Sequence, residues 1–135
     1  MAPSTKLDGA ARAIVADKNY AHLSVPREDG TILSVVIWSD VDDDGRVLVN
    51  TAEGRAWPRL LRRAGRATLS WANASNPFEF VSVTAKVVED THDGADAHID
   101  ALAKKYLDVD SYPGRTASET RVKFVLEPER VVHRA

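Results

Sequence analysis

The segment VLVNTAEGRAWPRLLRRAGR occupies residues 47–66 and carries two different periodicities in succession. Its first part is rich in β-branched residues and predicts a strand over about Arg46 to Thr51. The part that follows has Pro58 near its first turn, where proline is tolerated in a helix. The pattern therefore predicts a strand that turns directly into a short helix from about Arg55 to Ala64.

This predicted helix is unusually rich in arginine. Glu53 is the single acid beside five arginines: Arg55, Arg59, Arg62, Arg63 and Arg66. A helix N-terminus offers free backbone N–H groups and the positive end of the helix dipole, and Asn50 and Thr51 add side-chain donors. With bidentate arginine geometry, this corner predicts a phosphate-binding site. The alternative is that the arginines only solvate a helix whose other face, Leu60 and Leu61, packs on the fold.

The rest of the chain is predicted to consist mainly of strands joined by hairpins. Apolar spacing predicts an opening helix from Leu7 to Val15 and a third helix from Gly94 to Leu107. Asp-Gly pairs predict tight turns at the ends of Arg27–Gly30 and Asp40–Gly45. We expect six strands, at Tyr20–Val25, Ile32–Trp38, Arg46–Thr51, Arg66–Asn73, Phe78–Glu89 and Arg121–Glu127. The fold class is therefore mainly β, an antiparallel barrel or strongly curled sheet with three outer helices, because closing a sheet removes its exposed edges.

Composition limits the class of protein. The chain has 135 residues, 44% hydrophobic and 28% charged, so we expect one domain over residues 1–135 with an ordered core from about residue 8 to residue 133. Its 18 basic and 20 acidic residues give a net charge of −2, which provides no general attraction to nucleic acid or membrane. The sequence has no membrane-length apolar run, no export-type N-terminal segment and no cysteine. We therefore expect a cytoplasmic protein.

Other chemistries find little support in the sequence. The run from Asp40 to Gly45 matches only half of a calcium loop, since Thr51 stands where a bidentate glutamate is needed. The four histidines lack metal-binding spacing, and there is no nucleophile elbow, Walker loop or GxGxxG turn. The three tryptophans can stack on a flat ligand or fill the core: Trp38, Trp57 and Trp71. Mostly aliphatic strands disfavour a nucleic-acid-binding module.

Three stretches of the chain together resemble a known family. They are Val47–Ala56 followed by Leu61-Arg62-Arg63, the segment Lys105–Pro113, and the closing Val122–Val131. In order and spacing they resemble the split β-barrel flavin and deazaflavin oxidoreductases, which are the pyridoxamine-phosphate-oxidase-like, coenzyme F420-dependent enzymes common in actinobacteria. The resemblance spans essentially the whole chain and implies a six-stranded antiparallel split β-barrel, the FMN-binding split barrel, with about three peripheral helices.

The resemblance also implies where a cofactor binds. In this family the cofactor lies in a groove between the two subunits of a homodimer, with its phosphate at the strand-to-helix turn and its ring along the second hairpin strand. Carried onto this chain, the phosphate side is formed by Asn50, Thr51, Arg55 and Arg59. The ring side is lined by Ser34, Val35 and Val36. The second subunit completes the pocket through Trp71 or the segment Tyr106–Tyr112.

The chain departs from the family pattern at two phosphate-binding positions. Trp57 and Leu60 stand where the family has a lysine and an asparagine, with Pro58 between them. A missing ammonium group removes a charge-assisted contact of about 1.5 to 3 kcal/mol, or roughly ten- to a hundredfold in affinity. Trp57 either stacks on the ring or blocks the pocket.

The resemblance implies an F420-dependent oxidoreductase that transfers a hydride between the deazaflavin and an unsaturated acceptor such as an enone, a quinone or a tetrapyrrole. No catalytic triad is expected, because the cofactor supplies the reacting carbon; Tyr112 or a water molecule supplies the proton. The departures leave two alternatives open. One is an FMN-binding oxidoreductase of the same fold, and the other is a non-catalytic protein that binds or sequesters the cofactor.

Overall fold

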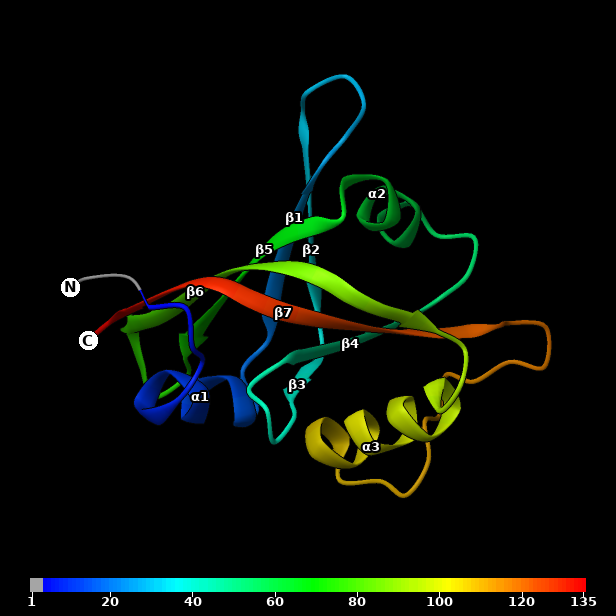
Figure 1. The fold of residues 1–135 in the computed structure, drawn as a ribbon. Helices are drawn as coiled ribbons and strands as arrows, with labels where there is room; N and C mark the ends of the chain where they lie inside the picture. Colours follow the sequence, from blue (N-terminus) through cyan, green and yellow to red (C-terminus); the bar gives the residue numbers. More distant parts are fainter. Residues whose placement is uncertain (1–3) are drawn as a thin grey trace.

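The computed structural model describes residues 4–135 (Figure 1). Its helices are α1 (Gly9–Ala16), α2 (Ala56–Ala64) and α3 (Ala95–Leu107). Its strands are β1 (Ala21–Pro26), β2 (Ile32–Ile37), β3 (Ser39–Val41), β4 (Val47–Ala52), β5 (Arg66–Asn73), β6 (Asn76–Thr91) and β7 (Arg121–Arg134). The three expected helices are confirmed, with ends shifted by one or two residues. Within the described range, no helix is both long enough and apolar enough to cross a membrane.

The strands form one antiparallel sheet in the order β2-β1-β5-β6-β7-β4-β3. β2 and β3 are therefore the two edges of the sheet, yet only Trp38 separates them along the chain. Because consecutive Cα atoms are about 3.8 Å apart, the two edges have to meet at this residue. The sheet can satisfy this only by curling on itself (Figure 1), and the expected strongly curled antiparallel sheet is confirmed.

The sheet has seven strands among residues 4–135, so the prediction of six was wrong by one. The additional strand is β3, which pairs with β4 from Ser39 opposite Val49 to Val41 opposite Val47. The sequence reading placed Asp40 and Val41 in a turn because they open an acidic run. The turn itself occupies only residues 42–45, where the Gly45 N–H donates to the Asp42 carbonyl at 3.1 Å.

The long strand β7 pairs with a neighbour on each side. It runs along β6 from Arg134 to Lys123 and along β4 from Leu126 to Arg121. It continues past the expected end at Glu127, because a register shift against β6 beside Pro128 accommodates the proline. Since β4 ends where the antiparallel β7 begins, the start of α2 and the start of β7 lie at the same end of the sheet.

Inward-facing residues of alternate strand positions fill the interior of the curled sheet. The largest fully buried side chains include Trp71, Phe124, Leu23, Leu69, Leu126 and Val49. α2 buries Trp57, Leu60 and Leu61 against this core and turns its arginines outward. It ends at Gly65, whose φ of 73° is the left-handed conformation that glycine adopts without strain.

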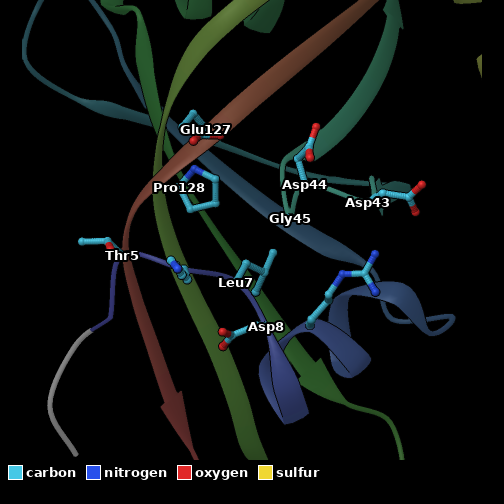
Figure 2. A pocket seen from close by; sticks show the side chains of 10 residues that line it. Thr5, Leu7, Asp8, Asp43, Asp44, Gly45, Glu127 and Pro128 are labelled. Atoms are coloured by element: carbon cyan, nitrogen blue, oxygen red, sulfur yellow. The ribbon is translucent and has the colours of Figure 1, made fainter.

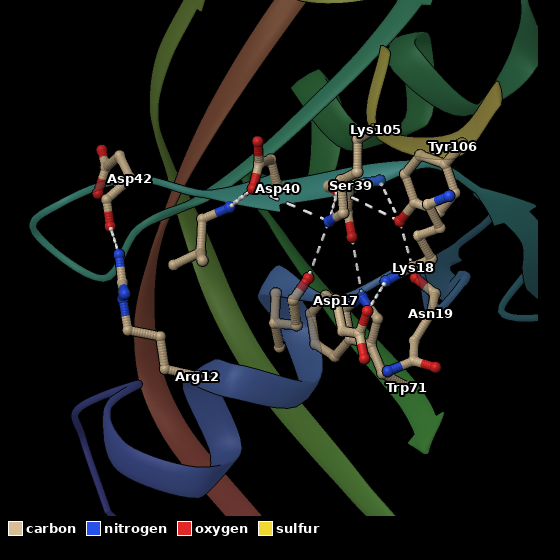
Figure 3. A network of polar contacts seen from close by, with 12 residues as sticks. Arg12, Asp17, Lys18, Asn19, Ser39, Asp40, Asp42, Trp71, Lys105 and Tyr106 are labelled. Carbon is tan, nitrogen blue, oxygen red and sulfur yellow. Dashed lines mark hydrogen bonds and ion pairs between the residues drawn. The ribbon is translucent and has the colours of Figure 1, made fainter. Parts of the chain in front are cut away.

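A polar network ties β3 to α3 and to the residues that precede β1 (Figure 3). The Trp71 indole N–H donates to the Ser39 hydroxyl at 2.8 Å, and both residues are fully buried. From α3, the Tyr106 hydroxyl donates to the Asn19 carbonyl at 2.7 Å, and the Lys105 ammonium donates to the Ser39 carbonyl at 2.7 Å. Burial lowers the pKa of Lys105. The network holds α3 beside the seam where the sheet edges meet.

Replacing Trp71 with phenylalanine should lower the free energy of unfolding by about 2 to 4 kcal/mol. The smaller ring leaves space in a filled core, and the Ser39 hydroxyl loses its indole partner. Chemical denaturation measures the loss. The double variant W71F/S39A should lose less than the sum of the W71F and S39A losses, because it leaves no unpaired hydroxyl. Strict additivity of the two single losses would contradict this account of the bond.

Candidate functional site

A groove of about 230 Å³ lies at the seam between the two edges of the sheet. Several elements contribute to it: the end of β2, the linking Trp38, β4, the residue before α2, α3, the loop after α3 and the start of β7. The side chains that line it are Val36, Ile37, Trp38, Asn50, Arg55, Ile99, Leu102, Tyr112 and Arg121. The structure thus brings together three residues predicted for the site, Val36, Asn50 and Arg55.

A second cavity, of about 430 Å³, adjoins the first turn of α2. It is lined by Glu53, Gly54, Arg55, Ala56, Pro58, Arg59 and Arg62. Arg55 lines both cavities, so this residue lies between the groove and the start of α2. The predicted phosphate residue Arg59 lies in the second cavity and not in the groove.

The N-terminus of α2 presents backbone donors that the chain itself does not cap. Arg55 is the N-cap residue, in an extended conformation, and no side chain caps the helix. The first N–H groups of a helix have no partner within it, although Pro58 contributes none. Gly54, at φ 92°, supplies the left-handed turn that leads from β4 into this corner. An anion at this position would meet free N–H groups and the positive end of the helix dipole.

Most of the arginines around α2 are already paired. Arg59 contacts Glu28 at 3.3 Å, Arg62 contacts Glu53 and Asp90 at 2.7 Å each, and Arg66 contacts Glu129 at 2.7 Å. Hydrogen bonds from Arg62 and then from His92 hold the pKa of Glu53 at about 2. Asp90 and Glu129 come from strands distant in sequence, so the local positive field expected from the segment is largely neutralised.

Arg55 and Arg63 are the two arginines of this segment that make no hydrogen bond or ion pair with the described part of the chain. Both are exposed. Arg55 precedes the first turn of α2, at the positive end of the helix dipole. Arg63 lies in the last turn, at the negative end, which stabilises a cation. Comparing variants of Arg55 and Arg63 therefore shows whether anion binding depends on any unpaired arginine or on an arginine at the start of the helix.

Asn50 is buried beside the groove, and its amide is fully engaged. The amide nitrogen donates to the Ala95 carbonyl at 2.9 Å and lies 3.1 Å from His98 Nδ1, while Oδ1 accepts from Arg121 Nε at 2.9 Å. Thr51 points to the opposite face of β4, as strand alternation requires, and its hydroxyl is buried without a partner in residues 4–135. The structure thus separates these two predicted phosphate ligands.

The residues predicted for the cofactor ring also divide between two faces. Ser34 and Val36 are exposed on the outer face of β2, whereas Val35 packs against the core. Trp57 is 6% exposed and lies 6.1 Å from the Phe124 ring, and it lines neither cavity. Trp71 belongs to the core network and not to the surface of this site. Leu60, which stands at the second departure from the family pattern, is also buried.

The sequence prediction of the cofactor-binding residues did not include Trp38 or Arg121, and it placed Tyr112 only in the segment contributed by the second subunit. Trp38 stacks on Tyr106 with ring centres 5.3 Å apart, and Tyr112 meets Trp38 edge-on at 6.0 Å. The Arg121 guanidinium lies over the Tyr112 ring at 5.2 Å. Tyr106 and Tyr112 bound the segment expected to complete the pocket from the second subunit, and Tyr112 also lines the groove of its own chain. Arg121 gave no local signal, because it reaches the groove only through the pairing of β7 with β4.

A cavity of about 330 Å³ lies away from this seam, beside α1 and the turn between β3 and β4 (Figure 2). Its polar lining mixes both charges, including Lys6, Asp8, Arg12 and Glu127. Arg12 is engaged by the Asp42 carbonyl at 2.9 Å. No group of three or more His, Asp or Glu side chains in the described residues is placed to hold a metal ion. The seam is therefore the better candidate site.

Comparisons with solved structures agree with this architecture. An F420 reductase superposes with a TM-score of 0.82 at 20% identity, covering 93% of this chain and 98% of its own. The chain has the fold of that protein. Two candidate pyridoxamine 5'-phosphate oxidases share this fold too. The one from Listeria innocua superposes with a TM-score of 0.67 at 12% identity, covering 90% of this chain and 92% of its own. The one from Lactobacillus delbrueckii superposes with a TM-score of 0.67 at 17% identity, covering 96% of this chain and 95% of its own. No protein-family model and no curated protein sequence matches the chain.

The part of this fold that suits the phosphate of a cofactor is the corner between β4 and α2. The uncapped start of α2 and the free guanidinium of Arg55 are complementary to a phosphate group. Trp57 and Leu60, by contrast, are turned into the core and supply no polar contact there. The corner therefore offers fewer ligands than the family pattern implies, but its cation and its helix N-terminus are in place.

The buried His98 beside Asn50 makes the stability of the fold depend on pH. Burial, together with the nearby charges of Lys123 and Arg121, lowers its pKa to about 4, against the weaker opposing effect of Asp40. A neutral ring whose Nδ1 accepts from Asn50 explains the short contact between them. The His98 ring takes up its second proton more readily in the unfolded chain than in the folded one. The free energy of unfolding therefore falls as pH drops from about 6.5 toward 4, by up to about 3 kcal/mol.

Replacing His98 with glutamine should flatten this dependence, since glutamine keeps an acceptor for Asn50 but has no proton to gain. The free energy of unfolding, measured by denaturant titration between pH 7 and pH 4, tests the prediction. Equal losses for the wild type and H98Q over that range would show that His98 does not carry the effect.

Proposed function

We propose that this protein is an F420-dependent oxidoreductase, a reductase that binds the deazaflavin at the seam and transfers a hydride to an unsaturated organic acceptor. The observation that carries the proposal is the position of Arg55. It is an unpaired cation at an uncapped helix N-terminus, and it lines both the groove and the cavity beside α2. The likeness in fold to an F420 reductase supports the choice of cofactor.

The chain's own residues have two tasks in this proposal. Arg55 and the first N–H groups of α2 hold the phosphate, while Val36 and neighbouring apolar groove residues exclude water from the reacting ring. When bound, F420 supplies a ring carbon that exchanges a hydride, so the protein needs no nucleophile. Among the residues that line the groove, Tyr112 carries a hydroxyl, and in this proposal it delivers the proton that accompanies the hydride to the acceptor. Enones, quinones and tetrapyrroles are acceptors of this kind.

The same geometry would accommodate the phosphate of FMN, and the likeness to pyridoxamine 5'-phosphate oxidases favours keeping FMN as the second candidate cofactor. A protein that binds the cofactor without turnover is the non-catalytic alternative. Fluorescence titration of the purified protein with F420 and with FMN in parallel shows which of these two cofactors it binds. Turnover with the three acceptor classes then separates an enzyme from a carrier.

Replacing Arg55 with alanine should weaken F420 binding by roughly ten- to a hundredfold, because a charge-assisted contact of about 1.5 to 3 kcal/mol is lost. The matched control is Arg63→Ala, which removes an equally exposed and unpaired arginine from the other end of the same helix. R63A should bind F420 almost as the wild type does. Equal losses of F420 affinity in the two variants would show that only the total positive charge matters, and would contradict a phosphate bound at the N-terminus of α2.

We infer further that the protein is a homodimer whose interface includes the outer face of β2, β1, β5 and β6. This face carries no Asp, Glu, Lys or Arg along its central rows, where Ser24 pairs with Ser34 and with Thr68, and Ser70 pairs with Ser82. Exposed apolar groups border these rows: Ile32, Val36 and Phe80. A second copy placed over these uncharged rows would cover the middle of the sheet and close the groove beside Val36 from water.

Sedimentation velocity at about micromolar concentration should show a dimer. The variant S70D, which places a charge in the middle of the face, should shift it to monomer, because two copies bring like charges together across a symmetric interface. Thr116→Asp, on the exposed loop before β7, is the matched control and should remain dimeric. A monomeric wild type would contradict the shared groove.

A further inference from the structure

Arg121 is a buried cation at the inner wall of the groove. It is 5% exposed at the first position of β7 and lines the groove. Its Nε donates to Asn50 Oδ1 at 2.9 Å, and its Nη1 lies 3.4 Å from a Glu119 carboxylate oxygen. Burying a charge is costly unless it is paired and fully hydrogen-bonded, so each donor of this group needs a partner.

The pairing of Arg121 within the chain is incomplete. Glu119 contacts it at a single oxygen and a long distance, whereas a bidentate arginine–carboxylate pair uses two parallel bonds. The other Glu119 oxygen is buried without a partner in the described chain. None of the hydrogen bonds within residues 4–135 uses Arg121 Nη2. The Nη2 amino group of this buried guanidinium is thus left for a ligand in the groove.

The orientation of this donor is fixed by its surroundings. The orientation of the Asn50 amide is set by the Ala95 carbonyl, which can only accept, so the amide nitrogen must face it. Its oxygen must therefore face Arg121. The Tyr112 ring covers one face of the guanidinium at 5.2 Å. A cation held on several sides is preorganised, so it loses little freedom when a ligand binds.

Five of the other eight residues that line the groove are apolar, and the remaining three are Asn50, Arg55 and Tyr112. Four aliphatic side chains and one indole form its walls: Val36, Ile37, Ile99, Leu102 and Trp38. A ligand that fits must therefore combine a flat apolar body with an oxygen anion at the end that meets Arg121. Small-molecule sites commonly have this composition, in which apolar walls give affinity and one polar group gives orientation.

We propose that Arg121 is a specificity-determining residue that binds the carboxylate of a flat, apolar substrate in the groove. The inference rests on the proposed function only in naming this ligand the substrate. The phosphate of the cofactor already has Arg55 and the α2 N-terminus, and a singly charged carboxylate matches the one free edge of a guanidinium that Glu119 partly neutralises. Asn50 and His98 are positioning residues that act through Arg121.

The test uses 2-naphthoate and its uncharged methyl ester as probes, with binding measured by calorimetry on the full-length protein. The wild type should bind the acid at least about tenfold more tightly than the ester, because only the acid forms the charge-assisted bond. Arg121→Gln should remove this preference and leave ester binding within about twofold of the wild type. Glu119→Gln is the matched control; it alters the same network but keeps the cation, so it should retain or increase the preference for the acid.

Because R121Q leaves Glu119 buried without its cation, the double variant E119Q/R121Q is measured as well. It should also lose the preference for the acid, and its thermal unfolding shows whether the fold is kept. Acid and ester of equal affinity in the wild type, no binding of either, or an unchanged preference in a folded R121Q or double variant would each overturn the proposal.

Titrating the same variants with F420 keeps the two proposals apart. R121Q should weaken F420 binding much less than R55A does, because the phosphate contact of Arg55 is kept. If F420 fails to bind any variant while naphthoate still depends on Arg121, the carboxylate site stands and the proposed function fails. If R121Q instead weakens F420 binding as strongly as R55A does, Arg121 serves the cofactor, and the substrate assignment is overturned.

Discussion

The candidate site exists because one residue, Trp38, joins the two edges of the sheet. Strands β2 and β3 are farthest apart in the order of the sheet, and the single-residue link forces them together. This closure brings Val36 of β2 beside Asn50 of β4, although the two strands share no hydrogen-bonded pairing in the described sheet. Stacking of Trp38 on Tyr106 at 5.3 Å supports the seam from the side of α3. The groove is therefore a consequence of topology, and its chemistry depends on which side chains reach the seam.

Local pairing then decides which charges can act on a ligand. The α2 segment is rich in arginine, but carboxylates from β6, β7 and the first hairpin neutralise three of its five guanidinium groups. Arg55 stays free at the start of α2, and Arg121 is buried with incomplete pairing at the start of β7. One is exposed and suited to a phosphate, whereas the other is desolvated and suited to a single carboxylate. In the functions proposed for them, Arg55 binds the cofactor and Arg121 binds the substrate.

The sequence was most informative where structure depends on neighbouring residues. Periodicity placed the three helices, the hairpins and the strand-to-helix corner, because these follow from local patterns of apolar and Asp-Gly residues. Strand alternation already implies that Asn50 and Thr51 face opposite ways, so treating both as phosphate ligands overlooked a local rule. Arg121 and Trp38 depend on the pairing of β7 with β4 and on closure of the sheet, which no local pattern carries. The burial of Trp57 likewise follows from how α2 packs.

The central claim is that the corner between β4 and α2 holds the phosphate of a deazaflavin. A crystal structure of the protein soaked with F420 tests it most directly. The account predicts phosphate density within hydrogen-bonding distance of the Arg55 guanidinium and of the first backbone N–H groups of α2, with the ring system directed along β2. An empty corner with F420 bound elsewhere, or the indole of Trp57 turned out to fill that corner, would contradict it.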